Sequence, residues 1–374
     1  MKWLYGILCL IFLIIFHEFG HFIAAKIFGV KVESFSVGFG PILLHKKFRG
    51  TDYRISLLPL GGYCGMKGEN DFRKAIEEDL SEIQAEKDSL YGVHPIKRAL
   101  IGFAGPFFNF IFAFLAFSFI YGIGFYYYTY SNKIILSDEV MENVTTTVAR
   151  DAGLKTGDYI IKIDDVSVSD FDEIKRMIAT RPEEEIQITV LRDNQELTFT
   201  VIPELNKELG YGIIGITIDE SEQIIKESEH FGFFGSLKKG FLDCIDTVSI
   251  TFKGIAILFK GVNIDNVISG PIRATELLGD TVKYGMAEGF RQGLVGILQI
   301  MAFISMSLCI MNLLPIPVLD GGLILVALIE FITRKKVKPK IQYYIQFIGI
   351  AFILVLAFIG IKGDIIYLIK KLRG

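Results

Sequence analysis

Two histidines and a glutamate near the start of the chain, in the stretch HEFGH, are the residues best suited to catalysis. His17 and His21 are four residues apart, so on a helix both imidazoles lie on one face and can reach the same metal ion. Zinc takes imidazole nitrogens as ligands, and a catalytic zinc site keeps one coordination position open for water. Glu18 would then act as the general base that removes a proton from this water.

These polar residues interrupt an apolar run, residues 3–28, that is long enough to cross a bilayer. The run is too long for the apolar part of a secretory signal peptide, so we expect a retained membrane helix. Ionisable side chains inside such helices are rare and usually functional, because hydrocarbon does not solvate charge. The sequence therefore predicts a zinc site within the first membrane helix.

A catalytic zinc site usually has three protein ligands, so one more side chain is needed. Two carboxylates, Asp320 and Glu330, lie at a plausible depth in a later apolar segment. Asp320 falls in the stretch NLLPIPVLDGG, where two prolines remove helical N–H donors and two glycines permit close backbone approach. Irregular backbone is tolerated in a membrane only where it is buried in protein or lines a wet cavity. These features favour Asp320, with Glu330 as the alternative.

Two asparagines within apolar segments are further candidates. Asn312 precedes the irregular stretch and could contact substrate or stabilise an oxyanion, whereas Asn109 lies in GFAGPFFNF of the second apolar segment. Each could instead make a hydrogen bond that holds two membrane helices together. The Gly105–Pro106 pair in the same stretch indicates close packing or a helix kink.

The composition of the whole chain is that of a membrane protein. Of its 374 residues 51% are hydrophobic, and the mean hydropathy is +0.44. The net charge is only −3, so no basic character points to nucleic acid. The cysteines are scattered without CxxC spacing, so we expect neither a disulfide framework nor a metal cluster from Cys9, Cys64, Cys244 and Cys309.

Four stretches could span a membrane: residues 3–28, 99–128, 294–333 and 341–361. Between the second and third, residues 140–205 alternate apolar and polar side chains like strands of a half-buried sheet. The sequence thus predicts a polytopic α-helical membrane protein with about four transmembrane helices and an inserted β-rich domain.

Lysine and arginine residues concentrate in the loop after the first span and in TRKKVKPK before the last. The positive-inside rule therefore predicts that these loops are cytoplasmic and that the inserted domain is extracytoplasmic. The amphipathic stretch at residues 207–290 is expected to lie on the membrane surface.

Four features follow one another along the chain: HEFGH, GFAGPFFNF, an inserted domain similar to PDZ domains, and MNLLPIPVLDGG. In this order they resemble the site-2 protease family of intramembrane zinc metalloproteases, peptidase family M50. The likeness is to its bacterial members that regulate sigma factors, and it covers essentially the whole chain. LLPLGGYCGMKGE also resembles the membrane-associated β-hairpin of that family. One departure is that several relatives carry two PDZ domains, whereas only one is found here.

The resemblance implies Zn2+ held by His17, His21 and Asp320, with Glu18 as general base. It further implies that Asn312 contacts or positions substrate, and that the loop at Gly61 and Gly62 pairs with an extended substrate strand. Asn109 is a further candidate for substrate contact because of its residue type and its place in the second apolar segment.

The implied function is regulated intramembrane proteolysis: cleavage inside the membrane helix of single-span proteins such as anti-sigma factors or remnant signal peptides. The implied location is the bacterial inner (cytoplasmic) membrane, with the lipid bilayer as a partner and a peptide ligand of the PDZ-like domain possible. Two other readings stay open: a membrane metal-ion transporter, and a PDZ receptor without catalysis. The predicted segments are a first transmembrane helix with HExxH (1–30), a cytoplasmic loop with a β-hairpin (31–98), a second helix (99–128), a PDZ-like domain (138–206), a surface segment (207–290), a broken third segment (291–333), and a fourth helix with tail (341–374).

Overall fold

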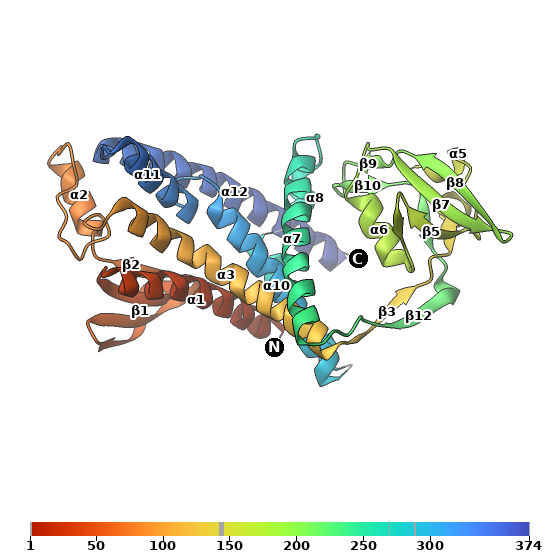
Figure 1. Cartoon of the computed structure of the whole chain (residues 1–374), viewed down its shortest axis with the longest axis horizontal. Helices are drawn as coiled ribbons and strands as arrows, with labels where there is room; N and C mark the ends of the chain where they lie inside the picture. The colour runs from red at the N-terminus through yellow and green to blue at the C-terminus, as the bar shows by residue number, and fades with distance from the viewer. Residues whose placement is uncertain (1, 142–145, 269, 288, 374) are drawn as a thin grey trace. The chain divides into compact units, whose positions relative to one another are not determined.

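The structure is a computed structural model that describes residues 2–141, 146–268, 270–287 and 289–373. Among these residues, four helices are long and apolar enough to cross a membrane. They are α1 (Lys2–Phe28), α3 (Pro95–Ile123), α10 (Phe290–Leu313) and α12 (Pro339–Arg373). The chain is a membrane protein, and its fold divides into two compact units that are described one at a time (Figure 1).

The first unit contains α1, α10, α3 as far as Gly122 and α12 as far as Asp364. It also contains α2 (Glu69–Glu77), α9 (Pro271–Gly285), α11 (Asp320–Thr333) and the first part of α7 (Phe233–Leu258). Helix α10 ends at Leu313 because Leu314, which precedes a proline, takes an extended conformation with ψ of 142°. The chain stays irregular until α11 begins at Asp320. Within this break Val318 has a φ of 84°, an unusual value for a β-branched residue.

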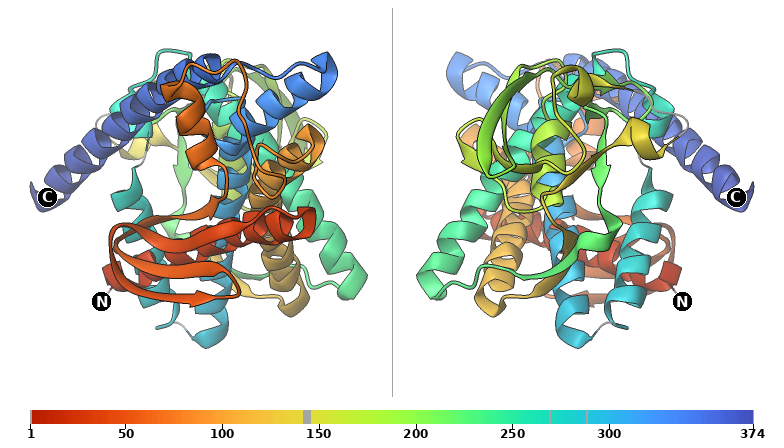
Figure 2. Two further views of the ribbon diagram at one scale, coloured as in Figure 1. Left: turned by 90° about the vertical axis from the view of Figure 1, so that its left-hand side faces the viewer. Right: turned by 90° about the vertical axis from the view of Figure 1, so that its right-hand side faces the viewer.

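A small sheet next to α1 is built from β1 (Val32–Phe48) and β2 (Thr51–Met66). The two strands are joined by a tight turn in which Arg49 and Gly50 both have positive φ, as hairpin turns require. Both strands bend, so that residues 34–37 lie between residues 52–55 on one side and residues 62–65 on the other. Residues 62–65 therefore form an outer strand, and the sheet lies beside α1 (Figure 2, left view).

The second unit contains a four-stranded antiparallel sheet in the order β6-β5-β7-β8. Helix α6 (Phe171–Ala179) starts where the Asp170 side chain accepts a hydrogen bond from the backbone N–H of Glu173 at 2.9 Å. Isoleucines from the sheet and from α6, among them Ile160, Ile174 and Ile188, form its core. The strands of this sheet are β5 (Tyr159–Ile163), β6 (Val166–Ser167), β7 (Ile186–Arg192) and β8 (Gln195–Val201). The remaining elements of the unit are β3 (Tyr126–Tyr130), β4 (Ile134–Leu136), α4 (Ser137–Val140), α5 (Val148–Asp151), β9 (Glu204–Asn206), β10 (Tyr211–Ile213), β11 (Ile216–Ile218), η1 (Glu220–Glu222), β12 (Gln223–Glu227) and α8 (Ile264–Val267).

Two boundaries differ from the sequence prediction. The second long helix ends at Ile123, because Gly124 adopts a left-handed φ of 61°, and the tyrosine-rich residues that follow form strand β3. The predicted surface segment is helical only in part, since residues 211–227 contain the short strands β10, β11 and β12. Strand β10 forms a local hairpin with β9, whereas β11 and β12 pair with β4 and β3, which are distant enough in sequence that local periodicity does not reveal the contacts.

Candidate active site

The first unit brings two histidines of α1 and the first residue of α11 together. The Nε2 atoms of His17 and His21 are 3.2 Å apart. Oδ2 of Asp320 lies 3.2 Å from Nε2 of His17, and its Oδ1 lies 3.3 Å from Nε2 of His21. Among the described residues, this is the one group of His, Cys, Asp or Glu side chains arranged to hold a metal ion.

These distances fit zinc. Ligand atoms about 2.0–2.1 Å from a tetrahedral zinc ion lie about 3.3–3.4 Å from one another, which is close to the three separations in the structure. Two imidazoles and one carboxylate are also a ligand set that catalytic zinc sites use, with the fourth position left for water. The donor set present in the protein therefore fits a catalytic zinc ion.

Small residues let helix α3 approach α1 at the site. A Cβ atom at Gly20 would lie 2.3 Å from the carbonyl oxygen of Ala104, so the two backbones are in direct contact. A Cβ atom at Gly105 would lie 2.3 Å from Nε2 of His21 and 2.8 Å from Cε1 of His17. Gly105 thus leaves free the space into which the ligand atoms of both histidines point.

The remaining ring nitrogen of each histidine has a partner on α3. Nδ1 of His21 lies 2.8 Å from the backbone carbonyl of Ile101, so it donates its proton there and leaves Nε2 unprotonated for the metal. Nδ1 of His17 lies 3.0 Å from the side-chain amide of Asn109. Asn109 is fully buried, and its backbone carbonyl accepts a hydrogen bond from Ser305 of α10 at 2.9 Å.

The amide of Asn109 can fix the protonation of His17. Its Nδ2 faces the ring while its buried Oδ1 has no hydrogen-bond partner. With the amide turned over, Oδ1 accepts a hydrogen bond from Nδ1–H of His17, and Nε2 of His17 keeps its lone pair for a metal. We propose Asn109 as a positioning residue for this ligand, a role different from the substrate contact that the sequence suggested.

Replacing Asn109 by alanine is expected to weaken zinc binding about 10- to 100-fold, because His17 loses the partner that orients its ring. The Asn109→Asp variant keeps an acceptor oxygen and should retain most of the affinity. Zinc affinity can be measured by competition with a chelator of known strength. Asn312→Ala is the matched control, since Asn312 lines the same cavity without touching a ligand. Equal losses in the two alanine variants would contradict the positioning role.

Glu18 lies beside the ligands and is not one of them. Cys64, in the outer strand of the β1–β2 sheet, lines the same cavity as Glu18. A Cβ atom on Gly62 would lie 3.6 Å from Cγ of Glu18, so the strand passes directly over this residue. Burial raises the pKa of the Cys64 thiol to about 12, so this neighbour of Glu18 is a neutral group at physiological pH.

A cavity of about 980 Å³ contains the three proposed ligands and Glu18. It also brings together the other residues singled out from the sequence, Asn109, Asn312, Gly61 and Gly62. Sequence reasoning missed further lining residues, which include Phe39, Tyr63 and Gln346. Gln346 could have been noticed as a polar residue inside the last apolar helix, whereas the two aromatic residues carry no distinguishing signal.

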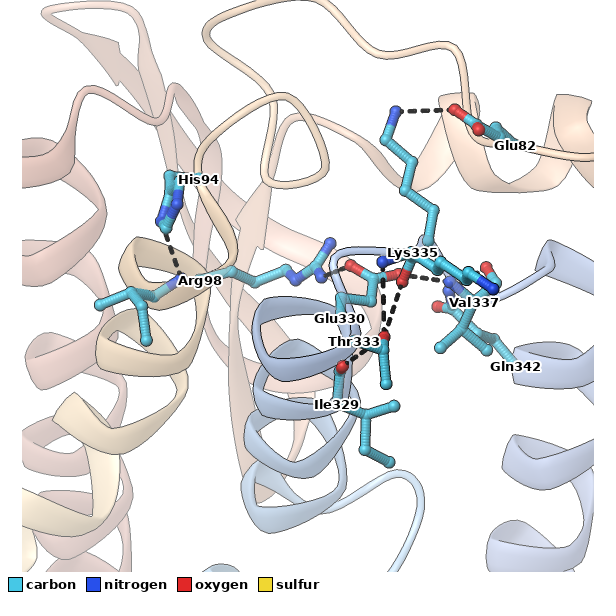
Figure 3. A network of polar contacts seen from close by, with 11 residues as sticks. Glu82, His94, Arg98, Ile329, Glu330, Thr333, Lys335, Val337 and Gln342 are labelled. Carbon is cyan, nitrogen blue, oxygen red and sulfur yellow. Dashed lines mark hydrogen bonds and ion pairs between the residues drawn. The ribbon is translucent and has the colours of Figure 1, made fainter.

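Glu330, the alternative third ligand, lies elsewhere. It is buried at the C-terminal end of α11, where it forms an ion pair with Arg98 of α3 (Figure 3). Its other oxygen accepts a hydrogen bond from the backbone N–H of Val337 at 2.8 Å. Glu330 is therefore not among the zinc ligands, and a buried arginine compensates its charge.

Comparisons with known proteins agree with this chemistry. The family model described as Peptidase family M50 matches residues 5–356. A protein of Campylobacter jejuni named "Putative zinc metalloprotease Cj1068" is 34% identical, over 98% of this chain and 93% of its own length. Relatives with the same general name from Treponema pallidum and Helicobacter pylori are 31% and 32% identical, over 98% and 96% of this chain and 99% and 98% of their own lengths. The chain belongs to peptidase family M50 and is a zinc metalloprotease.

Proposed function

We propose that this metalloprotease is an intramembrane endopeptidase that cleaves the membrane helices of single-span proteins. The observation that carries the proposal is the position of the ligands. His17 and His21 lie within a helix that is long and apolar enough to cross a membrane, and Asp320 begins α11 directly after the broken segment. A peptide bond can reach these residues only at membrane depth.

The residues around the ligands support peptide hydrolysis. When bound, zinc supplies Lewis-acid chemistry that activates water and polarises a carbonyl group. Glu18 is placed to accept a proton from the attacking water and to deliver it to the leaving amine. The side chain of Asn312 makes no hydrogen bond within the described residues and lines the cavity, so its amide is available to the substrate backbone.

The outer strand of the β1–β2 sheet supports binding of an extended substrate. Within the part of the chain that the structure describes, residues 62–65 pair with β1 along one edge and with no strand along the other, and Gly61 and Gly62 line the cavity next to Glu18. A membrane helix must unwind before its backbone can be cleaved, and pairing with a free strand edge would hold the unwound segment. The absence of side chains at Gly61 and Gly62 allows that close approach.

For the second unit we propose a PDZ-like domain, at residues 138–206, on the extracytoplasmic side. Its four-stranded antiparallel sheet and helix α6 support this assignment. The domain would exclude substrates with bulky outer parts or bind a peptide end. With the positive loops in the cytoplasm, this domain would face the outside. We further propose that the protein lies in the inner membrane of a bacterium and acts on anti-sigma factors or remnant signal peptides.

The proposal can be tested with the full chain in liposomes that contain a panel of single-span peptides. Wild-type protein should cut within the apolar span, lose activity after chelation, and regain it with added zinc. Asp320→Ala should lose both bound zinc and cleavage, whereas Asp165→Ala, at an exposed position of the second unit, should keep both. Cleavage only in the water-exposed parts of the peptides would show a metalloprotease that does not act within the membrane.

A further inference from the structure

A second cavity, of about 470 Å³, lies at the end of the helices opposite the break. It is formed where α3 begins at Pro95, α11 ends at Thr333 and α12 begins at Pro339. Because α3 and α12, two helices long enough to cross a membrane, both begin there, we place the cavity at the level where hydrocarbon meets the polar headgroups. None of the proposed zinc ligands lines it.

The walls of this cavity are strongly cationic. Four cationic side chains line it, and Glu330 is the one carboxylate. Glu330 is already neutralised by Arg98, with which it forms a buried ion pair (Figure 3). Lys336 pairs with Glu82 at 3.1 Å through side chains that are both more than half exposed.

Two of the cations remain uncompensated. Arg334 and Lys335 are exposed, and neither side chain makes an ion pair or hydrogen bond within the described residues. Arg98 is only 3% exposed, and its Nε has no hydrogen-bond partner although a buried donor is costly to leave unpaired. The cavity therefore has an excess of positive charge and unused donors that suit an anion.

Apolar side chains next to these cations indicate what carries the anion. Phe331 and Ile332, in the last turn of α11, are 47% and 76% exposed. Leu328 and Ile329, one turn earlier, are also exposed. An anion in the cavity would thus have an apolar surface directly beside it, which a free inorganic ion cannot use but an acyl chain can.

We propose that this cavity binds the phosphodiester headgroup of an anionic phospholipid, with the acyl chains along the exposed face of α11. Arg334 and Lys335 supply the charge, and the volume is within the range of small-molecule sites. The site is distinct from the zinc centre. It lies at the start of α3 and at the end of α11. These two helices also reach the zinc site, α3 through Gly105 and Asn109 and α11 through Asp320 at its other end.

The test is a titration of the purified full chain in detergent with short-chain phosphatidylglycerol, followed by native mass spectrometry. Phosphatidylcholine of equal chain length and inorganic phosphate are titrated in parallel. The double variant Arg334→Gln/Lys335→Gln removes the two uncompensated charges. Lys46→Gln/Lys47→Gln is the matched control, because both lysines are exposed and lie on β1, away from the cavity.

We expect one tightly held phosphatidylglycerol per chain, and binding about 10- to 30-fold weaker in the Arg334/Lys335 variant. The control should bind as the wild type does, and Arg334→Lys/Lys335→Arg should restore binding because it keeps both charges. Equal weakening in the control would show general charge attraction and overturn the site. Equal binding of phosphatidylcholine would do the same, and binding of inorganic phosphate at matched concentration would overturn the assignment to a lipid.

Discussion

The Glu18→Gln variant is expected to keep its zinc and to lose cleavage by about 10²- to 10⁴-fold. Glutamine has nearly the same shape as glutamate, but it cannot accept a proton from water. The ligands His17, His21 and Asp320 do not involve Glu18, so the metal should stay bound. Bound zinc is measured by elemental analysis, and cleavage by following single-span peptides in liposomes.

This experiment also separates the function classes that the sequence left open. A metal-ion transporter needs the ligands but has no chemical role for Glu18, so the variant would still move zinc across a vesicle membrane. A receptor without catalysis would show no cleavage in the wild type either. Loss of cleavage together with loss of zinc would mean that Glu18 shapes the metal site rather than serving as the base.

The Gly105→Ala variant is expected to lose most of its bound zinc. The new methyl group would lie 2.3 Å from Nε2 of His21, in the space where the metal must bind. Zinc content should fall to about a tenth or less, with cleavage falling in parallel.

Gly122→Ala is the matched control for this variant. It lies in the same helix, and its added methyl group would meet only Ser236 Oγ, at an ordinary 3.6 Å. Thermal unfolding of both variants in detergent separates loss of metal from loss of fold. A Gly105→Ala protein with full zinc and full activity would show that α3 does not approach the histidines as closely as the structure has it.

Some features of the site could be predicted from the sequence because they depend on local geometry. The four-residue spacing of His17 and His21 places both on one helix face, and the prolines before Asp320 interrupt α10 in the structure. Family M50 and zinc, which the resemblance implied, are confirmed by the comparisons.

Other features depend on contacts between distant segments. Nothing local to Asn109 shows that its amide faces His17, and nothing around Glu330 shows that Arg98 lies opposite. The β1–β2 sheet was expected as a simple hairpin, but its register places one stretch of β1 between two stretches of β2. Such pairings depend on where the chain bends, here at glycines with positive φ such as Gly38.

The backbone of Val318 has a thermodynamic consequence for the metal. A β-branched residue with a φ of 84° costs of the order of 1–3 kcal/mol, and it lies two residues before the ligand Asp320. The packing around the break must offset this cost, so the stability of the fold and the position of a proposed metal ligand are coupled through one backbone conformation.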